Sequence, residues 1–387
     1  MTGQADMIRF IRCLSIKRPR EADQRFIQNY LKKDIPWDYL LTTAKWEGVS
    51  GLLFSHLKSP RLINDVPQKV IRCLENIYLA TDAQNRASLS KIESLSHRLG
   101  DAKLQVMAIQ GLSIVDIYAE PGLRPLGDVD LMVLPDSKGR FRKVLWEAGY
   151  TLPDFRYVDL YTKGGLWIDI HTHILNLDRI KSRKYLFPED LTSLWERAVP
   201  FSEKLPLFLR PEPVDNFIAL AAHALKHSYS RLIWLVDLHE LLLKGLSWRK
   251  LTARARFWRQ DKVVLYALIL MEGFFHLNVP LTVKDDLGAK RLNGLEKHVL
   301  RLTIEGFFSG QTCYALWLCN IKGLPNKIRF VRESVFPGDQ VMAQIFPKRS
   351  GRADWVDYVK RAGGMLAMIF RTFHQAVLYS LKDSAKG

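Results

Sequence analysis

Residues 126–133 read LGDVDLMV, in which two carboxylates stand two positions apart among apolar residues. Side chains two apart on a β-strand point to the same face, so this pattern predicts a strand with Asp128 and Asp130 side by side. Adjacent carboxylates repel each other unless a cation lies between them, and carboxylate oxygens suit Mg²⁺ or Mn²⁺. A solvated strand edge is the simpler interpretation, but the segments on both sides favour a metal site.

The upstream segment has the pattern of an anion-binding turn. An apolar run over residues 103–109 predicts a strand, which ends at Gln110 and Gly111, and residues 112–118 have helical spacing. Free backbone N–H groups and the helix dipole at such a junction attract phosphate. Gly111 and the hydroxyl of Ser113 are therefore candidate phosphate ligands, and an ordinary strand-to-helix turn is the alternative.

A third carboxylate follows downstream. Residues 166–173 read LWIDIHTH and alternate strictly, which predicts a second strand with Asp169 and His171 on one face. A two-metal phosphoryl-transfer site needs a further acid that ligates the second metal or takes the proton from the attacking hydroxyl. Asp128, Asp130 and Asp169 are thus the predicted metal ligands and catalytic residues, and His171 is a candidate to line the same cleft.

Together these motifs resemble a known family. QGLS at 110–113, PGLRPLGDVD at 121–130 and IDIH at 168–171 are similar to an uncharacterised bacterial nucleotidyltransferase-like family of the polymerase-beta-type nucleotidyltransferase superfamily. The similarity covers about residues 25–250. It implies Mg²⁺-dependent transfer of a group from a nucleoside triphosphate to a hydroxyl-type acceptor, such as a peptide or a sugar in a biosynthetic pathway. The chain departs from the family at Gln110, where Lys is usual, and the missing cation weakens a phosphate contact.

Two alternatives stay open on the same fold. One is a transferase that uses a nucleotide sugar. The other is a non-catalytic binding module with a basic partner-binding surface, which Gln110 favours weakly and the three intact carboxylates oppose.

Further cleft candidates come from isolated polar residues. Arg124 precedes the Asp-x-Asp motif and could bind a triphosphate bidentately, or be a solvated loop residue. His223 and His227 stand four apart on a predicted helix, a spacing that can bind zinc; without a third ligand they are more typical of cleft-lining or core residues. Asp237 interrupts an apolar helix, and a buried carboxylate there needs a partner, more often a His or Arg than a substrate.

The charge of the chain is strongly positive and uneven. The net charge is +17, and residues 245–387 carry 23 Lys and Arg against 11 Asp and Glu. Basic residues interleaved with Trp248 and Trp258 can bind nucleic acid, an anionic membrane surface or an acidic peptide; a solvated helix face is the alternative. The hypothesis drawn from this run is one exposed positive surface that recruits an anionic partner, formed by Arg249, Lys250, Arg254, Arg256 and Arg259.

The patterns predict an α+β protein with a small mixed-sheet core embedded in helices. The expected parts are an N-terminal helical region over 1–100, a nucleotidyltransferase-like core over 101–175 and a C-terminal helical region over 176–387. No apolar run has the length of a transmembrane segment, no signal peptide is evident, and the four cysteines are scattered. A cytoplasmic protein is therefore expected.

Overall fold

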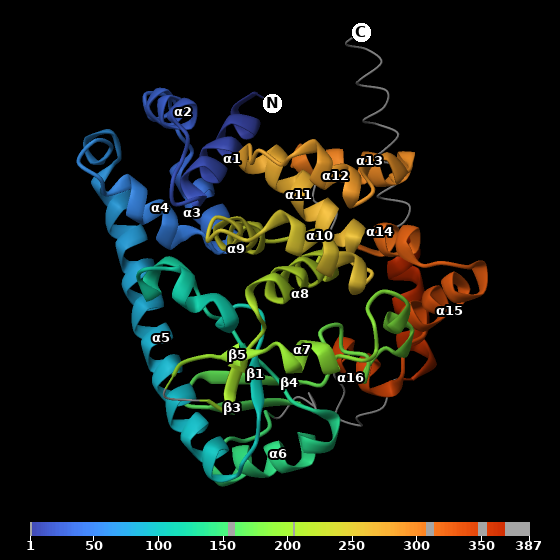
Figure 1. Cartoon of the computed structure of the whole chain (residues 1–387). Helices are drawn as coiled ribbons and strands as arrows, with labels where there is room; N and C mark the ends of the chain where they lie inside the picture. The colour runs from blue at the N-terminus through green and yellow to red at the C-terminus, as the bar shows by residue number, and fades with distance from the viewer. Residues whose placement is uncertain (1, 154–158, 204–205, 307–312, 347–353, 368–387) are drawn as a thin grey trace.

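A six-stranded mixed sheet forms the base of the molecule (Figure 1). The computed structural model describes residues 2–153, 159–203, 206–306, 313–346 and 354–367. The strands lie in the order β3-β4-β2-β1-β6-β5; β2 runs parallel to β4, β1 parallel to β6, and the other neighbours are antiparallel. Their bounds are Val106–Ala108 for β1, Val129–Met132 for β2, Leu160–Lys163 for β3, Leu166–His171 for β4, Val199–Pro200 for β5 and Phe208–Arg210 for β6.

Helices cover both faces of this sheet, so the predicted α+β class is confirmed. Helix α5 (Gln68–Asp101) runs the full length of one side of the molecule, and α6 (Lys138–Glu147) packs beneath the sheet, whereas α8 (Pro213–Lys226) lies above it (Figure 1). The remaining α-helices are α1 (Thr2–Ser15), α2 (Glu21–Leu31), α3 (Trp37–Glu47), α4 (Ser50–Leu57), α7 (Thr192–Glu196), α9 (Leu232–Leu242), α10 (Trp248–Phe257), α11 (Asp261–Phe275), α12 (Leu281–Asp286), α13 (Gly294–Ile304), α14 (Cys313–Asn320), α15 (Leu324–Val335) and α16 (Asp339–Ile345).

The alternation of β2 and β4 separates an apolar face from a polar one. Val129, Leu131, Ile168 and Ile170 are buried in a core shared with α5 and α6. The residues between them therefore point to the opposite face, beneath α8. Burial of the apolar set leaves only one register that keeps the carboxylates out of the core.

The sequence pattern predicts an antiparallel pair over residues 155–161 and 165–173, and the β3–β4 hairpin confirms it. Its two turn residues, Gly164 and Gly165, both have positive φ, at 52° and 82°. A two-residue turn of this kind matches the twist of the strands, and glycine adopts it without strain. Residues 154–158, at the start of the first strand of this pair, lie outside the described residues. Prolines in the C-terminal half predict breaks between helices, and one of these, at Pro347, also lies outside the described residues.

The helical parts before and after the sheet share one core. Residues of α1, α4, α8, α9 and α11 belong to a single buried apolar cluster. The segment 176–387, predicted as a C-terminal helical region, also supplies β5 and β6, and β6 pairs with β1. The predicted helix at 112–118 is a short 3₁₀ helix over Leu112–Ile117.

Across the described parts of the chain, every helix is too short or too polar to cross a lipid bilayer.

Candidate functional site

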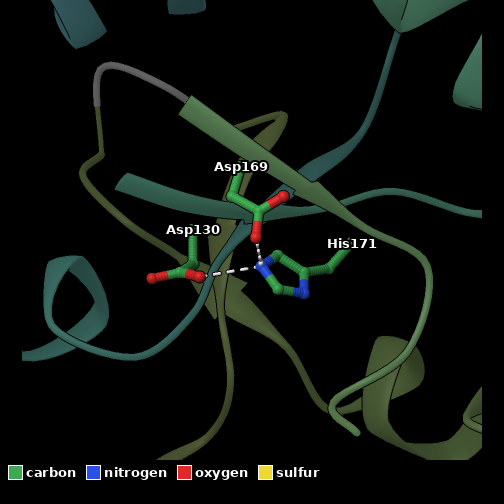
Figure 2. A group of neighbouring side chains, drawn as sticks. All are labelled: Asp130, Asp169 and His171. Atoms are coloured by element: carbon green, nitrogen blue, oxygen red, sulfur yellow. Dashed lines mark hydrogen bonds and ion pairs between the residues drawn. The ribbon is translucent and has the colours of Figure 1, made fainter. Parts of the chain in front are cut away.

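Two carboxylates and an imidazole meet on the polar face of the sheet. Asp130 and Asp169 are paired residues of the parallel strands β2 and β4, and His171 lies two positions further along β4. The Nε2 of His171 lies 2.7 Å from Oδ1 of Asp130 and 3.3 Å from Oδ2 of Asp169 (Figure 2). One ligand atom from each residue lies within 4.8 Å of the other two, a spacing that can accommodate one metal ion.

The raised pKa of His171 favours an imidazolium, which offsets part of the negative charge of Asp130 and Asp169. Burial disfavours the charged imidazole, but its hydrogen bonds to Asp130 and Asp169 prevail and raise the pKa of His171 to about 9. Burial likewise opposes ionisation of Asp169, yet His171 and Arg179 lower the pKa of that carboxyl. Since metal ligands must be deprotonated, a divalent cation would compete with this proton for the same oxygens. The two carboxylates and the imidazole fit a divalent cation, and the carboxylate oxygens suit Mg²⁺ or Mn²⁺.

Two residues with unusual backbone conformations support this group. The side-chain amide of Gln110 donates a 2.9 Å hydrogen bond to Asp130, and Oδ1 of Asn176 lies 3.2 Å from Nδ1 of His171. Gln110 and Asn176 have φ of 54° and 55°, in the left-handed region that non-glycine residues seldom adopt. Such strained residues cluster at functional sites, where the surrounding structure holds them in place.

Asp128 lies at the mouth of the same cleft, outside the three-residue group. It precedes β2 and its side chain is exposed, although it lines the cleft with Asp130. Partial enclosure by the cleft walls and the neighbouring charge of Asp130 raise the pKa of Asp128 to about 6. We call Asp128, Asp130, Asp169 and His171 the strand wall of the cleft. That all three carboxylates bind metal stays a prediction.

The opposite side of the cleft is basic and aromatic. The cleft has a volume of about 230 Å³. Its helical wall is formed by residues of α8, α9 and the residue before α9, namely His223, Lys226, His227, Arg231 and Trp234. The rings of His223 and His227 are 4.6 Å apart, and Trp234 lies 5.2 Å and 5.1 Å from them. The two histidines therefore line the cleft, as expected, and the buried Nδ1 of His223 has no hydrogen-bond partner among the described residues.

Among the described residues, Lys226 is the cation of this cleft with the weakest polar contact. Arg179 donates to Asp169 at 2.8 Å, and Arg231 donates to the backbone carbonyl of Trp46 at 3.0 Å. In the described residues, the polar contact of the Lys226 ammonium is Oδ1 of Asn176, at 3.4 Å. Burial and the nearby Arg183 lower the pKa of Lys226 to about 8. A desolvated ammonium of this kind is a strong attractor for an anion.

Arg124 and Asp237 form a buried ion pair that joins the two walls. The Arg124 guanidinium donates to Asp237 at 2.8 Å and 3.2 Å, and the Tyr118 hydroxyl donates to the same carboxylate at 2.7 Å. The third guanidinium nitrogen donates to the carbonyl of Pro125. Asp237 therefore has the arginine partner that its apolar surroundings require. Arg124 lines the cleft with every nitrogen engaged, so its triphosphate contact stays a prediction.

The predicted phosphate turn is divided between the cleft and another cavity. Gly111 lines the cleft, where a Cβ would collide with the guanidinium of Arg124. The Ser113 side chain is buried, and its oxygen lies 2.7 Å from the carbonyl of Gln110 and 2.9 Å from Oδ1 of Asn216. Ser113 lines a separate cavity at the start of α8, away from the carboxylates.

The sequence reasoning missed Arg179, Asn176, Lys226 and Trp234. Arg179 and Asn176 come from the irregular segment after β4, which carries no periodic signal. Lys226 could have been found, because positions 223, 226 and 227 share one face of a helix.

Comparison with known proteins identifies the family of the chain. No match was found among curated proteins or among solved structures. The model of a family described as uncharacterised nucleotidyltransferase matches residues 33–276, which contain the sheet, both walls of the cleft and the Arg124–Asp237 pair. The chain therefore belongs to this family of uncharacterised nucleotidyltransferases.

Proposed function

We propose that this protein transfers a nucleotidyl group from a nucleoside triphosphate to a hydroxyl-type acceptor, with Mg²⁺ or Mn²⁺ bound in the cleft. The observation that carries the proposal is the pairing of Asp130 and Asp169 across β2 and β4, opposite a wall that contains Lys226. Acidic metal ligands facing a basic surface match the two charges of a metal–triphosphate complex.

Asp128, Asp130 and Asp169 would hold the metal, which supplies Lewis-acid stabilisation of the charge on the phosphoryl oxygens. Asp130 has Oδ2 available, since Gln110 and His171 both contact its Oδ1. Across the cleft, Lys226 would bind the phosphates and so supply the cation that Gln110 lacks. Its compact ammonium is suited to this as a point charge.

In the proposed reaction the acceptor hydroxyl oxygen attacks the α-phosphorus, and the bond from that phosphorus to the bridging oxygen breaks. Pyrophosphate leaves with the bonding electron pair, and a carboxylate takes the hydroxyl proton. Asp169 was predicted either to ligate the second metal or to take this proton, and its two oxygens contact His171 and Arg179. We assign the proton to Asp128, whose exposed carboxylate can ligate the metal through one oxygen and meet an incoming hydroxyl with the other. Positioning and charge stabilisation then account for most of the rate.

The test is nucleotide binding with and without the metal. ATP, GTP, CTP and UTP are each added to the full-length protein, and the thermal midpoint of unfolding is measured with Mg²⁺, with Mn²⁺ and with chelator. At least one triphosphate should raise the midpoint, and only when the metal is present. Asp130→Asn should abolish this shift. Asp116→Asn is the matched control, because Asp116 is an exposed carboxylate paired with Arg210 outside the cleft.

Retention of the metal-dependent shift in Asp130→Asn would contradict the proposed site. Absence of any shift with all four triphosphates would contradict the proposed substrate. Tight metal-dependent binding without pyrophosphate release, in the presence of a panel of peptides and sugars, would favour the non-catalytic binding module.

A further inference from the structure

A second and larger cavity lies behind α8. It has a volume of about 650 Å³ and is enclosed by the α10–α11 corner, α14, the start of α15 and the segment around Tyr185. It shares no lining residue with the cleft: Ala222 lines this cavity, while the next residue, His223, lines the cleft. We call it the basic cavity. Its volume falls within the range of small-molecule sites and is too small for a nucleic-acid duplex.

Positive charge dominates the lining. Five basic side chains face one acidic side chain, Asp261. Three of the five have carboxylate partners: Arg256 pairs with Asp286 at 2.8 Å, Lys262 with Glu296 at 2.7 Å, and Arg291 with Asp261 at 3.3 Å. The other two, Arg259 and Lys322, have no ion pair within the described part of the chain. The cavity therefore carries about two uncompensated positive charges. This matches in magnitude the negative charge of one phosphate monoester.

The backbone holds Arg259 in a conformation that disfavours arginine. Arg259 follows the end of α10 with φ of 56°, and its N–H donates to the carbonyl of Arg256 while that of Gln260 donates to Ala255. This is a Schellman helix end, in which glycine is the usual residue at the left-handed position. A hydrogen bond also holds the α10–α11 corner in place, because the buried side-chain amide of Gln260 donates to the carbonyl of Leu186 at 2.6 Å. Arg259 is thus presented from a rigid support, at a site where glycine would be less strained.

Apolar side chains line the same cavity as these charges. Leu175, Leu186 and Val263 line it together with Trp317 and Tyr185. A lining that combines aromatic and aliphatic side chains with two cations free of ion pairs in the described residues suits an anion that also has a ring or another apolar part.

The basic run from Arg249 to Arg259, predicted to form one exposed surface, is divided among different sites in the structure. Arg254 donates to the fully buried Asp215 at 2.6 Å, and Lys250 lines the cavity at the start of α8. Only Arg256 and Arg259 of that run reach the basic cavity.

From these observations we propose that the basic cavity binds a small phosphate monoester with a ring or apolar portion, and that Arg259 and Lys322 contact its phosphate. The proposal is independent of nucleotidyl transfer in the cleft. The shared chemistry is a dianionic phosphate next to an apolar group, whichever metabolite carries it.

Calorimetric titration of the full-length protein with phenyl phosphate tests the proposal. Phenyl phosphate should bind more tightly than inorganic phosphate or benzoate, and raising the salt from about 0.05 M to about 0.5 M should weaken it. The double variant Arg259→Gly/Lys322→Gln should lose about tenfold or more in affinity. Arg259→Gly alone should leave the unfolding midpoint unchanged or raise it, because glycine relieves the strained corner. If a variant loses phenyl phosphate binding while its unfolding midpoint is preserved, the loss is due to the missing side-chain contact and not to unfolding.

Two matched variants complete the design. Arg249→Gln/Lys250→Gln removes two exposed charges from the same helix, outside the cavity, and should bind phenyl phosphate like the wild type. Lys226→Gln removes the cation of the cleft and should also bind normally. No binding by the wild type, or unchanged binding by Arg259→Gly/Lys322→Gln, would overturn the proposal. Loss only in Lys226→Gln would place the phosphate in the cleft, and equal affinity for inorganic phosphate would overturn the ring-binding part.

Discussion

The two walls of the cleft are built in different ways. The strand wall comes from two short strands whose alternation alone places Asp130 and Asp169 on one face. The helical wall gathers Lys226 and Trp234 from α8 and α9, whose register against the sheet depends on packing. The strand wall is acidic and suited to a metal, whereas the helical wall is basic and aromatic. The comparison teaches that the local motif supplies only half of a metal–triphosphate site. The Arg124–Asp237 pair holds the two halves at their separation.

The largest expected effect comes from breaking the link between the walls. Arg124→Ala leaves the carboxylate of Asp237 buried without its cation, and Asp237 has no exposed surface. Breaking a buried pair from one side costs about 3–5 kcal/mol of unfolding free energy. Chemical denaturation of the wild type and the variant measures this. In the double variant Arg124→Met/Asp237→Leu the cost should fall well below that of Arg124→Ala, because no charge stays buried. A loss below about 1 kcal/mol in Arg124→Ala would contradict the linking role.

Next in size is the loss of a carboxylate from the strand wall. Asp128→Asn should weaken metal-dependent triphosphate binding by about 100-fold, since even outer partners of metal ligands are worth about 10–100-fold. Stability should not fall, because enclosure and the neighbouring Asp130 raise the pKa of Asp128 to about 6, so at neutral pH its negative charge is less favourable in the folded chain than in the unfolded one. Calorimetry and thermal unfolding separate the two effects. If Asp128→Asn binds the triphosphate and metal normally, Asp128 is not a metal ligand, and only Asp130, Asp169 and His171 would hold the ion.

A smaller effect is expected on the helical wall. Lys226→Met should weaken triphosphate binding by about tenfold while metal binding stays normal, because the ammonium contacts phosphate and not the metal. Titration with Mn²⁺ alone and with Mn²⁺ plus the triphosphate distinguishes the two. Equal weakening of both would mean that Lys226 acts through the strand wall.

The smallest effect is a pH dependence of triphosphate affinity of a few-fold. Lys226 has its pKa lowered to about 8 by burial and Arg183, with Arg179 adding to the shift and Asp130 and Asp169 opposing it. The ammonium is therefore charged below about pH 8 and neutral above, so the contribution of Lys226 to affinity should fall as the pH rises from about 7 to about 9, while loss of the His171 proton favours metal binding over the same range. Lys226→Arg should flatten this dependence, because arginine stays protonated.

The free energy of unfolding should change with pH in the opposite direction. The unfolded lysine binds its proton more tightly, so this group favours the folded state increasingly between about pH 8 and pH 10.5. The same pH dependence of triphosphate affinity in the wild type and in Lys226→Arg would contradict the assignment.

The strand wall was accessible from the sequence because its signal is local. Alternation in residues 126–133 and 166–171 predicts which side chains share a face, and the structure pairs Asp130 with Asp169 on adjacent strands. The need of Asp237 for a buried partner was also predictable from its apolar helix. The partner itself, Arg124, lies 113 positions away, and no pattern in the sequence connects the two.

What local sequence could not specify is how the other segments surround these strands. Ser113 follows a turn of the predicted kind, yet packing directs its hydroxyl to Asn216 and away from the cleft. The run from Arg249 to Arg259 is contiguous in sequence, but successive turns of a helix and the corner after it direct its charges to different cavities. The period of a strand or helix is set by its own backbone, so the chain alone determines which residues share a face. Which faces meet is decided by the burial of apolar surface over the whole molecule, and only the tertiary structure contains that result.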